Sequence, residues 1–324
     1  MAKKGKKLKK LAALTAGAGA AYAGITYLMY HEVMHRKAPI WNAISPIAWK
    51  KMCETSGAPM VDRPNDPRYE WFATAPFETY HILNDDGQQL SARLYKADQP
   101  SDVYIFLSHG YRSSGPNEYS LISRFYHELG YNVFMVDHRA SGDSEGEQIG
   151  YGYHESKDCM KWLNYLMVEF GEDIRIVLHG ISMGSATVMI MSGMPDLPDN
   201  VKFIVADCGY TSAWDEFVHN LENAHVPVHP LLDGANFWNR KFNGYDFRDA
   251  NPIESVKHSK VPMLFIHGDC DDFVPTRMGK ELYLACAAPY KDLLITHGAD
   301  HAHSYDITPE PYEAKVKEFI EKFL

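Results

Sequence analysis

Residues 173–185 read DIRIVLHGISMGS: an apolar, strand-like run, then GISMG at 180–184, then the small residues that begin a helix. In a G-x-S-x-G elbow the serine sits on a strained turn between a strand and a helix, and the glycines permit a close backbone approach that a Cβ would block. The bare pattern is common by chance. Its position at the end of a buried strand is what indicates that Ser182 is a nucleophile.

Similar apolar runs recur along the chain. They read VYIFLS at 103–108, YNVFMV at 131–136, VKFIVA at 201–206, VPMLFI at 261–266 and DLLIT at 292–296. Runs that are apolar on both faces are typical of parallel strands buried between helices. Helical stretches are expected between them, at 117–129, 154–170, 183–194, 276–287 and 309–324, and a hairpin at 78–95 precedes them. The alternation predicts an α/β fold with a mostly parallel, doubly wound sheet and an antiparallel start.

The charges are divided between a basic tail and an acidic body. The chain has 324 residues and a formal net charge of −10. Six lysines lie in the first ten residues, so the remainder carries −10 − 6 = −16. Nucleic-acid binders concentrate Lys and Arg over one face of the fold, so we expect no nucleic-acid partner.

An uncharged stretch of twenty residues, Leu11 to Tyr30, follows the lysines. This is about the length that a helix needs to cross a bilayer, and the lysines should stay in the cytoplasm. We therefore expect a signal-anchor over residues 1–30 and a single-pass protein of the cell membrane, with its body outside the cytoplasm. The alternatives are a signal peptide cleaved after Ala21-Tyr22-Ala23, which would release a secreted protein, and a soluble N-terminal helix.

Three further segments follow this tail. Residues 31–68 are irregular and rich in proline, which predicts a connector, and the main domain is expected over residues 69–324. Within it, residues 211–260 have no strand signal and contain seven aromatic side chains. We expect a helical lid there, with Phe237 and Trp238 as substrate contacts; the alternative is that these rings only pack the insertion.

A serine hydroxyl needs a base within hydrogen-bond reach and an acceptor that fixes the tautomer of the base. Two later loops supply both residue types: HGDCDDFVP at 267–275 and HGADHAHSY at 297–305. Each loop follows a predicted strand, at the edge where open α/β sheets place their sites. The chain order is serine, aspartate, histidine, and several aspartates and histidines could fill the two roles.

These motifs resemble those of the α/β-hydrolase superfamily over residues 69–324, and within it bacterial membrane-anchored serine hydrolases of the esterase or serine-aminopeptidase type. The family pattern H-G-x-x-D-x-x-V-P falls on the first loop. The resemblance therefore gives the role of the acid to Asp271, with Asp269 and Asp272 as alternatives.

The late family pattern H-A-x-S-Y falls on residues 301–305. The resemblance gives the role of the general base to His301, with His303 and His297 as alternatives.

The oxyanion hole needs two backbone N–H groups aimed at the developing charge. One is expected at Met183, directly after the nucleophile. The other is implied by the family's H-G-x loop, which gives the backbone N–H of Tyr111. A family segment D-x-R-G-x-G-x-S falls on residues 137–144 and departs at Ala140, where glycine is usual; Arg139 in it could instead bind an anionic substrate.

The sequence thus predicts a serine hydrolase that acts through an acyl-enzyme on small-molecule substrates, first of all carboxylic esters. Alternatives are a peptidase or amidase of aminopeptidase type, an acyltransferase or thioesterase, and a non-catalytic binding protein. Glu222, Asp215 and Asp233 are candidates for holding a substrate amine. No cofactor or metal is expected, because the sixteen histidines and five cysteines form no H-E-x-x-H motif and no Cys/His quartet.

Overall fold

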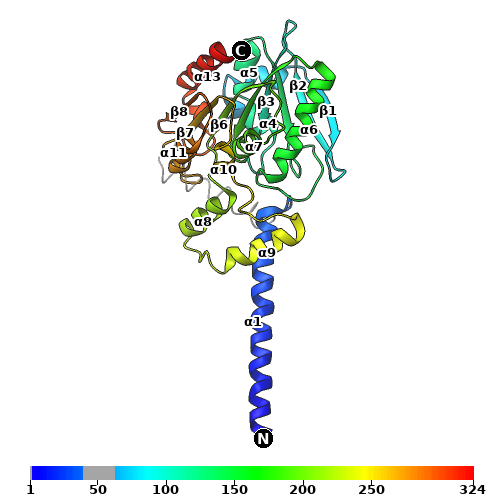
Figure 1. Cartoon of the computed structure of the whole chain (residues 1–324), viewed down its shortest axis with the longest axis vertical. Helices are drawn as coiled ribbons and strands as arrows, with labels where there is room; N and C mark the ends of the chain where they lie inside the picture. Colours follow the sequence, from blue (N-terminus) through cyan, green and yellow to red (C-terminus); the bar gives the residue numbers. More distant parts are fainter. Residues whose placement is uncertain (1, 39–62) are drawn as a thin grey trace.

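The computed structural model describes residues 2–38 and 63–324, with side chains described from residue 17 onward. A sheet of eight strands lies at its centre, in the order β1-β2-β4-β3-β5-β6-β7-β8 (Figure 1). The strands are β1 (Glu78–Leu83), β2 (Gln89–Tyr95), β3 (Val103–Ser108), β4 (Asn132–Asp137), β5 (Arg175–Ile181), β6 (Val201–Asp207), β7 (Met263–Gly268) and β8 (Lys291–Thr296). The β1–β2 and β2–β4 pairs are antiparallel and the other pairs are parallel. The predicted α/β-hydrolase fold is confirmed.

Helices cover both faces of the sheet because alternate side chains of each buried strand point to opposite faces. On one face, Phe106 and Leu178 pack with Trp162 of α6 and Met189 of α7. On the other face, Ile105 and its neighbours pack with the last helix. The main-domain helices are α3 (Tyr69–Thr74), α4 (Gly115–Tyr119), α5 (Ile122–Glu128), α6 (Tyr153–Phe170), α7 (Met183–Ser192), α8 (Ala213–Asn223), α9 (Leu231–Asn243), α10 (Pro252–Val256), α11 (Thr276–Ala285), α12 (Ser304–Ile307) and α13 (Pro309–Phe323), and a short 3₁₀ helix spans Arg63–Asn65.

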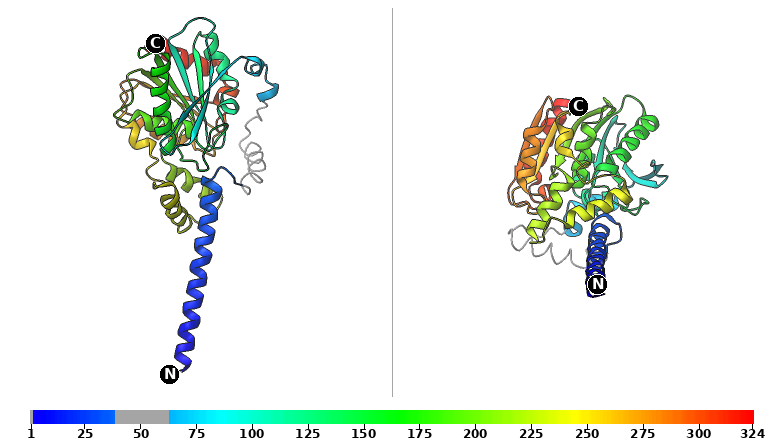
Figure 2. Two further views of the ribbon diagram at one scale, coloured as in Figure 1. Left: turned by 90° about the vertical axis from the view of Figure 1, so that its right-hand side faces the viewer. Right: turned by 60° about the horizontal axis from the view of Figure 1, so that its bottom comes forward.

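The N-terminal helix α1 (Ala2–Met34) projects away from the domain, but its C-terminal end packs into it (Figures 1 and 2). Tyr30 and Met34 are buried, and the backbone N–H of Ile149 donates to the carbonyl of Met34 at 2.7 Å. The chain after the helix continues this contact, because the backbone N–H of Arg36 donates to Glu147. Residues at the end of the expected anchor and the start of the expected connector are therefore packed against the domain. Most of that connector, residues 39–62, lies outside the described residues.

Within the part of the chain that the structure describes, no helix combines the length and the apolar character needed to cross a bilayer. The signal-anchor, the cell-membrane location and the domain boundaries stay predictions.

The interval 211–260 contains no strand among its residues, all of which are described. Its helices α8 and α9 lie beside the sheet, at the end where α1 enters the domain (Figure 1). Figure 2 shows that α9 runs across α1. The predicted helical insertion thus packs on the N-terminal helix at that end of the domain (Figure 1).

Candidate active site

Ser182 lies on the turn between β5 and α7, and the backbone there fits only a narrow choice of residues. Its φ is +55°, in the left-handed region that non-glycine residues seldom adopt. A Cβ on Gly180 would collide with the backbone of Gly184, and a Cβ on Gly184 would collide with the carbonyl of Ser108. Strand, turn and helix can therefore meet this closely only because both flanking positions are glycine.

The structure brings Ser182, His301 and Asp271 together in one hydrogen-bonded chain. The Oγ of Ser182 lies 2.8 Å from Nε2 of His301, and Nδ1 of His301 lies 2.8 Å from Oδ2 of Asp271. All three residues are buried. This geometry lets the imidazole accept a proton from the hydroxyl while the carboxylate fixes its tautomer.

Asp271 is held by more than His301. Its Oδ1 accepts the backbone N–H groups of Phe273 and Val274 at 3.0 and 2.9 Å, and Nε2 of His267 lies 3.3 Å from its Oδ2. Burial by itself raises the pKa of Asp271, but His301 and His267 outweigh burial and hold the pKa well below its ordinary value. The carboxylate therefore stays ionised, which is what an orienting acid requires.

Burial disfavours the charged form of a histidine, so by itself it lowers the pKa of His301. The negative charge of Asp271 is stronger, and the pKa of His301 is raised well above 6.5. A raised pKa makes the imidazole a stronger base, and it also means that the pH must be higher before the imidazole is neutral.

The alternative acids and bases are engaged elsewhere. Asp269 accepts from the backbone of Gly298 at 2.7 Å and lies 2.8 Å from Nδ1 of His297. His303 lies 2.7 Å from Asp300. Asp272 is exposed rather than buried with Asp271 and His301. Of the candidates for acid and base, only Asp271 and His301 form the hydrogen-bonded chain to Ser182.

Two residues beside the triad were missed by the sequence analysis. The thiol of Cys208, at the end of β6, lies within 4.8 Å of ligand atoms of Asp271 and His301. These three groups could hold a metal ion, but burial raises the pKa of the Cys208 thiol to about 12, so the thiol stays protonated without one. No motif marks this cysteine, which the sequence analysis treated only as one of five.

The second missed residue is Glu216 of α8, which is buried. Its Oε1 accepts from Asn220 at 2.7 Å, whereas its Oε2 has no hydrogen-bond partner. Burial raises its pKa to about 8, and the charges of His301 and Asp271 also act on it. Its neighbour Asp215, a candidate from the sequence, is exposed instead. Helical spacing alone could not tell which of these two adjacent carboxylates faces inward.

The expected oxyanion donors flank the nucleophile. Met183 is the first residue of α7, so its N–H is among those that a helix leaves without an intrahelical acceptor. The loop that contains Tyr111 is close as well, because a Cβ on Gly110 would lie 3.3 Å from the Cβ of Ser182. Both backbone segments thus lie beside Ser182.

The loop that contains Tyr111 is also tied to α1. The hydroxyl of Tyr111 donates to the carbonyl of Val33 at 2.7 Å. Arg112 donates to the carbonyls of Glu32 and His35, both at 2.7 Å. Positive charge at the C-terminal end of a helix also interacts favourably with the helix dipole. The end of α1 therefore positions one wall of the site, which no local sequence pattern indicates.

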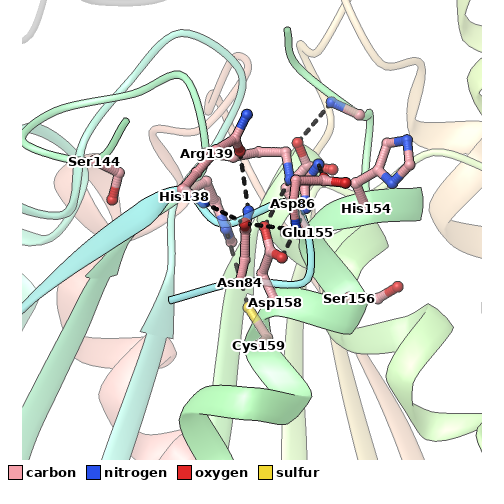
Figure 3. Close-up of polar contacts among 12 residues, drawn as sticks. Asn84, Asp86, His138, Arg139, Ser144, His154, Glu155, Ser156, Asp158 and Cys159 are labelled. Carbon is pink, nitrogen blue, oxygen red and sulfur yellow. Dashed lines mark hydrogen bonds and ion pairs between the residues drawn. The ribbon is translucent and has the colours of Figure 1, made fainter. Parts of the chain in front are cut away.

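The segment with the family's D-x-R-G-x-G-x-S pattern has a structural role. Arg139 donates two hydrogen bonds to Asp158, at 2.6 and 2.7 Å, and one to Asp86 at 2.9 Å (Figure 3). Its charge is thus balanced within the fold rather than directed at a substrate. Ala140 has a φ of +59°, which explains why glycine is usual at this position.

The two expected lid contacts lie where α9 meets α1. The indole N–H of Trp238 donates to Oγ1 of Thr26 at 3.2 Å, and its ring lies 5.4 Å from that of Tyr27. Phe237 is 53% exposed and its ring contacts Trp238. These contacts belong to the packing of α9 on α1, so a role of the two rings in binding substrate stays a prediction.

Comparison with known proteins found relatives of this chain. Residues 117–324 match the sequence pattern of the prolyl oligopeptidase family. An uncharacterized protein of Bacillus subtilis, YqkD, is 31% identical over 225 residues, which cover 69% of this chain and 72% of that protein. The lysophosphatidylserine lipase ABHD12 of Danio rerio is 26% identical over 206 residues, which cover 61% of this chain and 51% of the lipase.

Among solved structures, the esterase Pf2001 of Pyrococcus furiosus is similar with a TM-score of 0.63 and 23% identity. The likeness covers 82% of this chain and 97% of the esterase. At this identity the likeness bears on the fold alone.

Proposed function

The chain belongs to the prolyl oligopeptidase family within the α/β-hydrolase superfamily, and from this membership we propose that it is a serine hydrolase of carboxylic esters that acts through an acyl-enzyme on Ser182. The observation that carries the proposal is the hydrogen-bonded chain from Ser182 through His301 to Asp271, with both distances at 2.8 Å.

The chemistry follows from the roles of these groups. The Oγ of Ser182 attacks the carbonyl carbon of the substrate while Nε2 of His301 takes its proton. The same nitrogen then gives that proton to the leaving alcohol as the ester bond breaks. A water molecule repeats the sequence on the acyl-enzyme, and its hydrolysis releases the acid and restores Ser182.

The oxyanion of each tetrahedral intermediate requires hydrogen-bond donors that are already in place. The backbone N–H groups of Tyr111 and Met183 are proposed for this role, because both segments adjoin Ser182. Loss of one such donor typically lowers kcat by about 100- to 1,000-fold. Because Arg112 and the Tyr111 side chain bind the end of α1, the first of these donors depends on a helix far from it in sequence.

Esters are proposed as the substrate class because a relative that matches 61% of this chain is named a lipase. The name of the matched family favours peptides as a second candidate. A peptidase of the aminopeptidase type would need a group near the triad to bind the substrate amine. The buried carboxyl of Glu216 lies near enough to the triad to be affected by the charge of His301, so it is the residue to examine for that role.

One experiment separates these possibilities. The full-length protein is first treated with a fluorophosphonate probe, with Ser182→Ala as the control, and labelling is expected only in the wild type. It is then assayed on p-nitrophenyl esters of increasing acyl length and on aminoacyl p-nitroanilides. A higher kcat/KM on esters supports the proposal, and a higher kcat/KM on the anilides would transfer it to peptides. Labelling of the alanine variant at the wild-type rate would refute Ser182 as the nucleophile.

A further inference from the structure

Exposed apolar side chains gather where α1 meets α9. Ten large apolar side chains are exposed among the described residues, and six of the ten lie on these two helices. They are Tyr22, Ile25, Tyr27, Leu28, Phe237 and Phe242, and we refer to them as the α1–α9 surface. A soluble monomer seldom gathers this many exposed apolar side chains on two packed helices unless it binds something.

The surface is built on a fixed contact between the helices. The rings of Tyr27 and Trp238 meet edge to face at 5.4 Å, and Phe242 stacks on Trp238 at 5.9 Å. The hydroxyl of Tyr22 donates to the carbonyl of Pro230 at 2.8 Å. Thr26, which accepts the indole N–H of Trp238, is buried. The exposed rings are therefore held in place on the outside of a packed helix pair.

The charges of the chain favour a partner for this surface that is both apolar and negatively charged. No charged residue occurs from Leu11 to Tyr30, and six lysines precede that stretch. The ammonium of Lys241 lies over the rings of Trp238 and Phe242, at 5.2 and 5.4 Å. The remainder of the chain carries −16. Tyr and Trp prefer the interface between lipid headgroups and acyl chains, and lysines there bind anionic headgroups. Two parallel copies, in contrast, would bring two lysine-rich tails together.

We propose that the α1–α9 surface docks on a lipid bilayer that contains anionic headgroups. The exposed apolar side chains of α1 enter the outer part of the apolar layer, and the rings of α9 lie at the interface. Phe237 and Trp238 then serve the attachment to lipid rather than the fit of a substrate. The acidic remainder of the domain is repelled by the same headgroups and stays in water.

Docking at this surface also affects the site. The end of α1 holds the loop with Tyr111 and Arg112 through three carbonyls, those of Val33, Glu32 and His35. A membrane-bound α1 therefore keeps the oxyanion loop at a fixed height above the lipid. The inference concerns binding and does not depend on which substrate Ser182 attacks.

The test uses the full-length protein in a Ser182→Ala background, so that no lipid is hydrolysed, and measures flotation with vesicles. The vesicles are phosphatidylcholine with or without phosphatidylserine. The test variant, Leu28→Ser with Phe237→Ser, removes one exposed apolar side chain from each helix. The matched control, Val168→Ser with Leu284→Ser, removes two side chains that are 86% and 75% exposed on α6 and α11. Because Leu28 and Phe237 are both largely exposed, the test variant should fold, and its melting temperature checks this.

Wild type and control should float with the phosphatidylserine vesicles, and added salt should weaken that binding. The test variant should bind at least about tenfold more weakly, because two apolar side chains no longer leave water. A wild type that binds neither vesicle, or a test variant that binds as well as the control, would overturn the proposal. Should sedimentation instead reveal a dimer that the test variant dissociates, without vesicle binding, the surface belongs to a second copy and the proposal fails. If the test variant does not fold, Ile25→Ser, at a site that is 56% exposed, replaces it with the same expectations.

Discussion

The edge of the sheet that carries the proposed triad and the α1–α9 surface are built in opposite ways. At the edge, Ser182 follows directly on β5 between two glycines that permit its turn, and Asp271 and His301 lie in the loops after β7 and β8. At the α1–α9 surface, the partners are remote in sequence: Trp238 and Thr26 are 212 residues apart, and Tyr22 and Pro230 are 208 apart. The comparison teaches that local motifs specify the chemistry, whereas long-range helix packing specifies where the site is held.

The largest expected effect lies at the nucleophile. Ser182→Ala should lower kcat by about 10⁶-fold, the scale seen when the serine of a protease triad is removed. The free energy of unfolding should change by only about 1 kcal/mol, because the substitution removes one small polar group. Single-turnover assays together with thermal unfolding would check both. A variant that keeps one tenth of the activity would place the nucleophile elsewhere.

The second-largest effect is expected at the acid, Asp271. Asp271→Asn should lower kcat by about 10⁴-fold, because the imidazole loses the acceptor that holds its tautomer. Asp269→Asn and Asp272→Asn serve as neighbours of the same size and should change kcat by less than about tenfold. An equal loss at Asp269 or Asp272 would transfer the role of the acid.

Glycine-to-alanine substitutions compare the packing of the two regions directly, through the free energy of unfolding. Gly184→Ala should lower the free energy of unfolding by about 3 kcal/mol or more, because its Cβ would collide with the carbonyl of Ser108. Gly24→Ala in α1 should be neutral or slightly stabilising, because nothing lies within 4 Å of a Cβ there and alanine favours helix. Denaturant unfolding of both variants measures the difference. Equal losses at the two positions would contradict the contrast between the regions.

The pH dependence reports the base. Hydrolysis needs neutral His301, and Asp271 raises the pKa of His301 well above 6.5. Activity should therefore rise about tenfold per pH unit at lower pH and level off only above pH 6.5. In Asp271→Asn the raising charge is gone, so the midpoint should move to lower pH. NMR titration of His301 in the wild type and the variant checks the direction of the pKa change. An unchanged midpoint would argue against an interaction between Asp271 and His301.

The smallest effect on chemistry is expected at the α1–α9 surface. Trp238→Ala removes a ring that contacts α1, so it should lower the melting temperature by a few degrees, consistent with about 1 to 3 kcal/mol for a partly buried side chain. Hydrolysis of a short acetyl ester in solution should stay within about threefold. A loss of preference among acyl-chain lengths without loss of stability would instead support the expectation that this ring contacts substrate.

The sequence predicted the fold, and its motifs indicated the residues that form the hydrogen-bonded chain. Both predictions were possible because strands, elbows and loop motifs are local patterns. It did not predict that Cys208 and Glu216 lie beside the triad. Cys208 has no motif, and Glu216 differs from its neighbour Asp215 only in the face of α8 that it occupies. The contact of Arg112 with the end of α1 could not be predicted either, because its partners Glu32 and His35 are 80 and 77 residues away in the sequence.

That last contact bears on how the protein should be produced. Shortened versions of such chains are commonly begun after the apolar N-terminal stretch, which here would mean a start near residue 31. Such a start would keep only the last turn of α1, and a remnant this short could not stay helical alone to present the carbonyls of Glu32 and Val33, and of His35 just after it. Arg112 and the hydroxyl of Tyr111 would then lose these acceptors, so we expect a preparation of that kind to be poorly active. A start before Tyr22 retains the helix that packs on α9, and comparing the specific activity of the two preparations would show how far catalysis depends on an N-terminal segment that is routinely discarded.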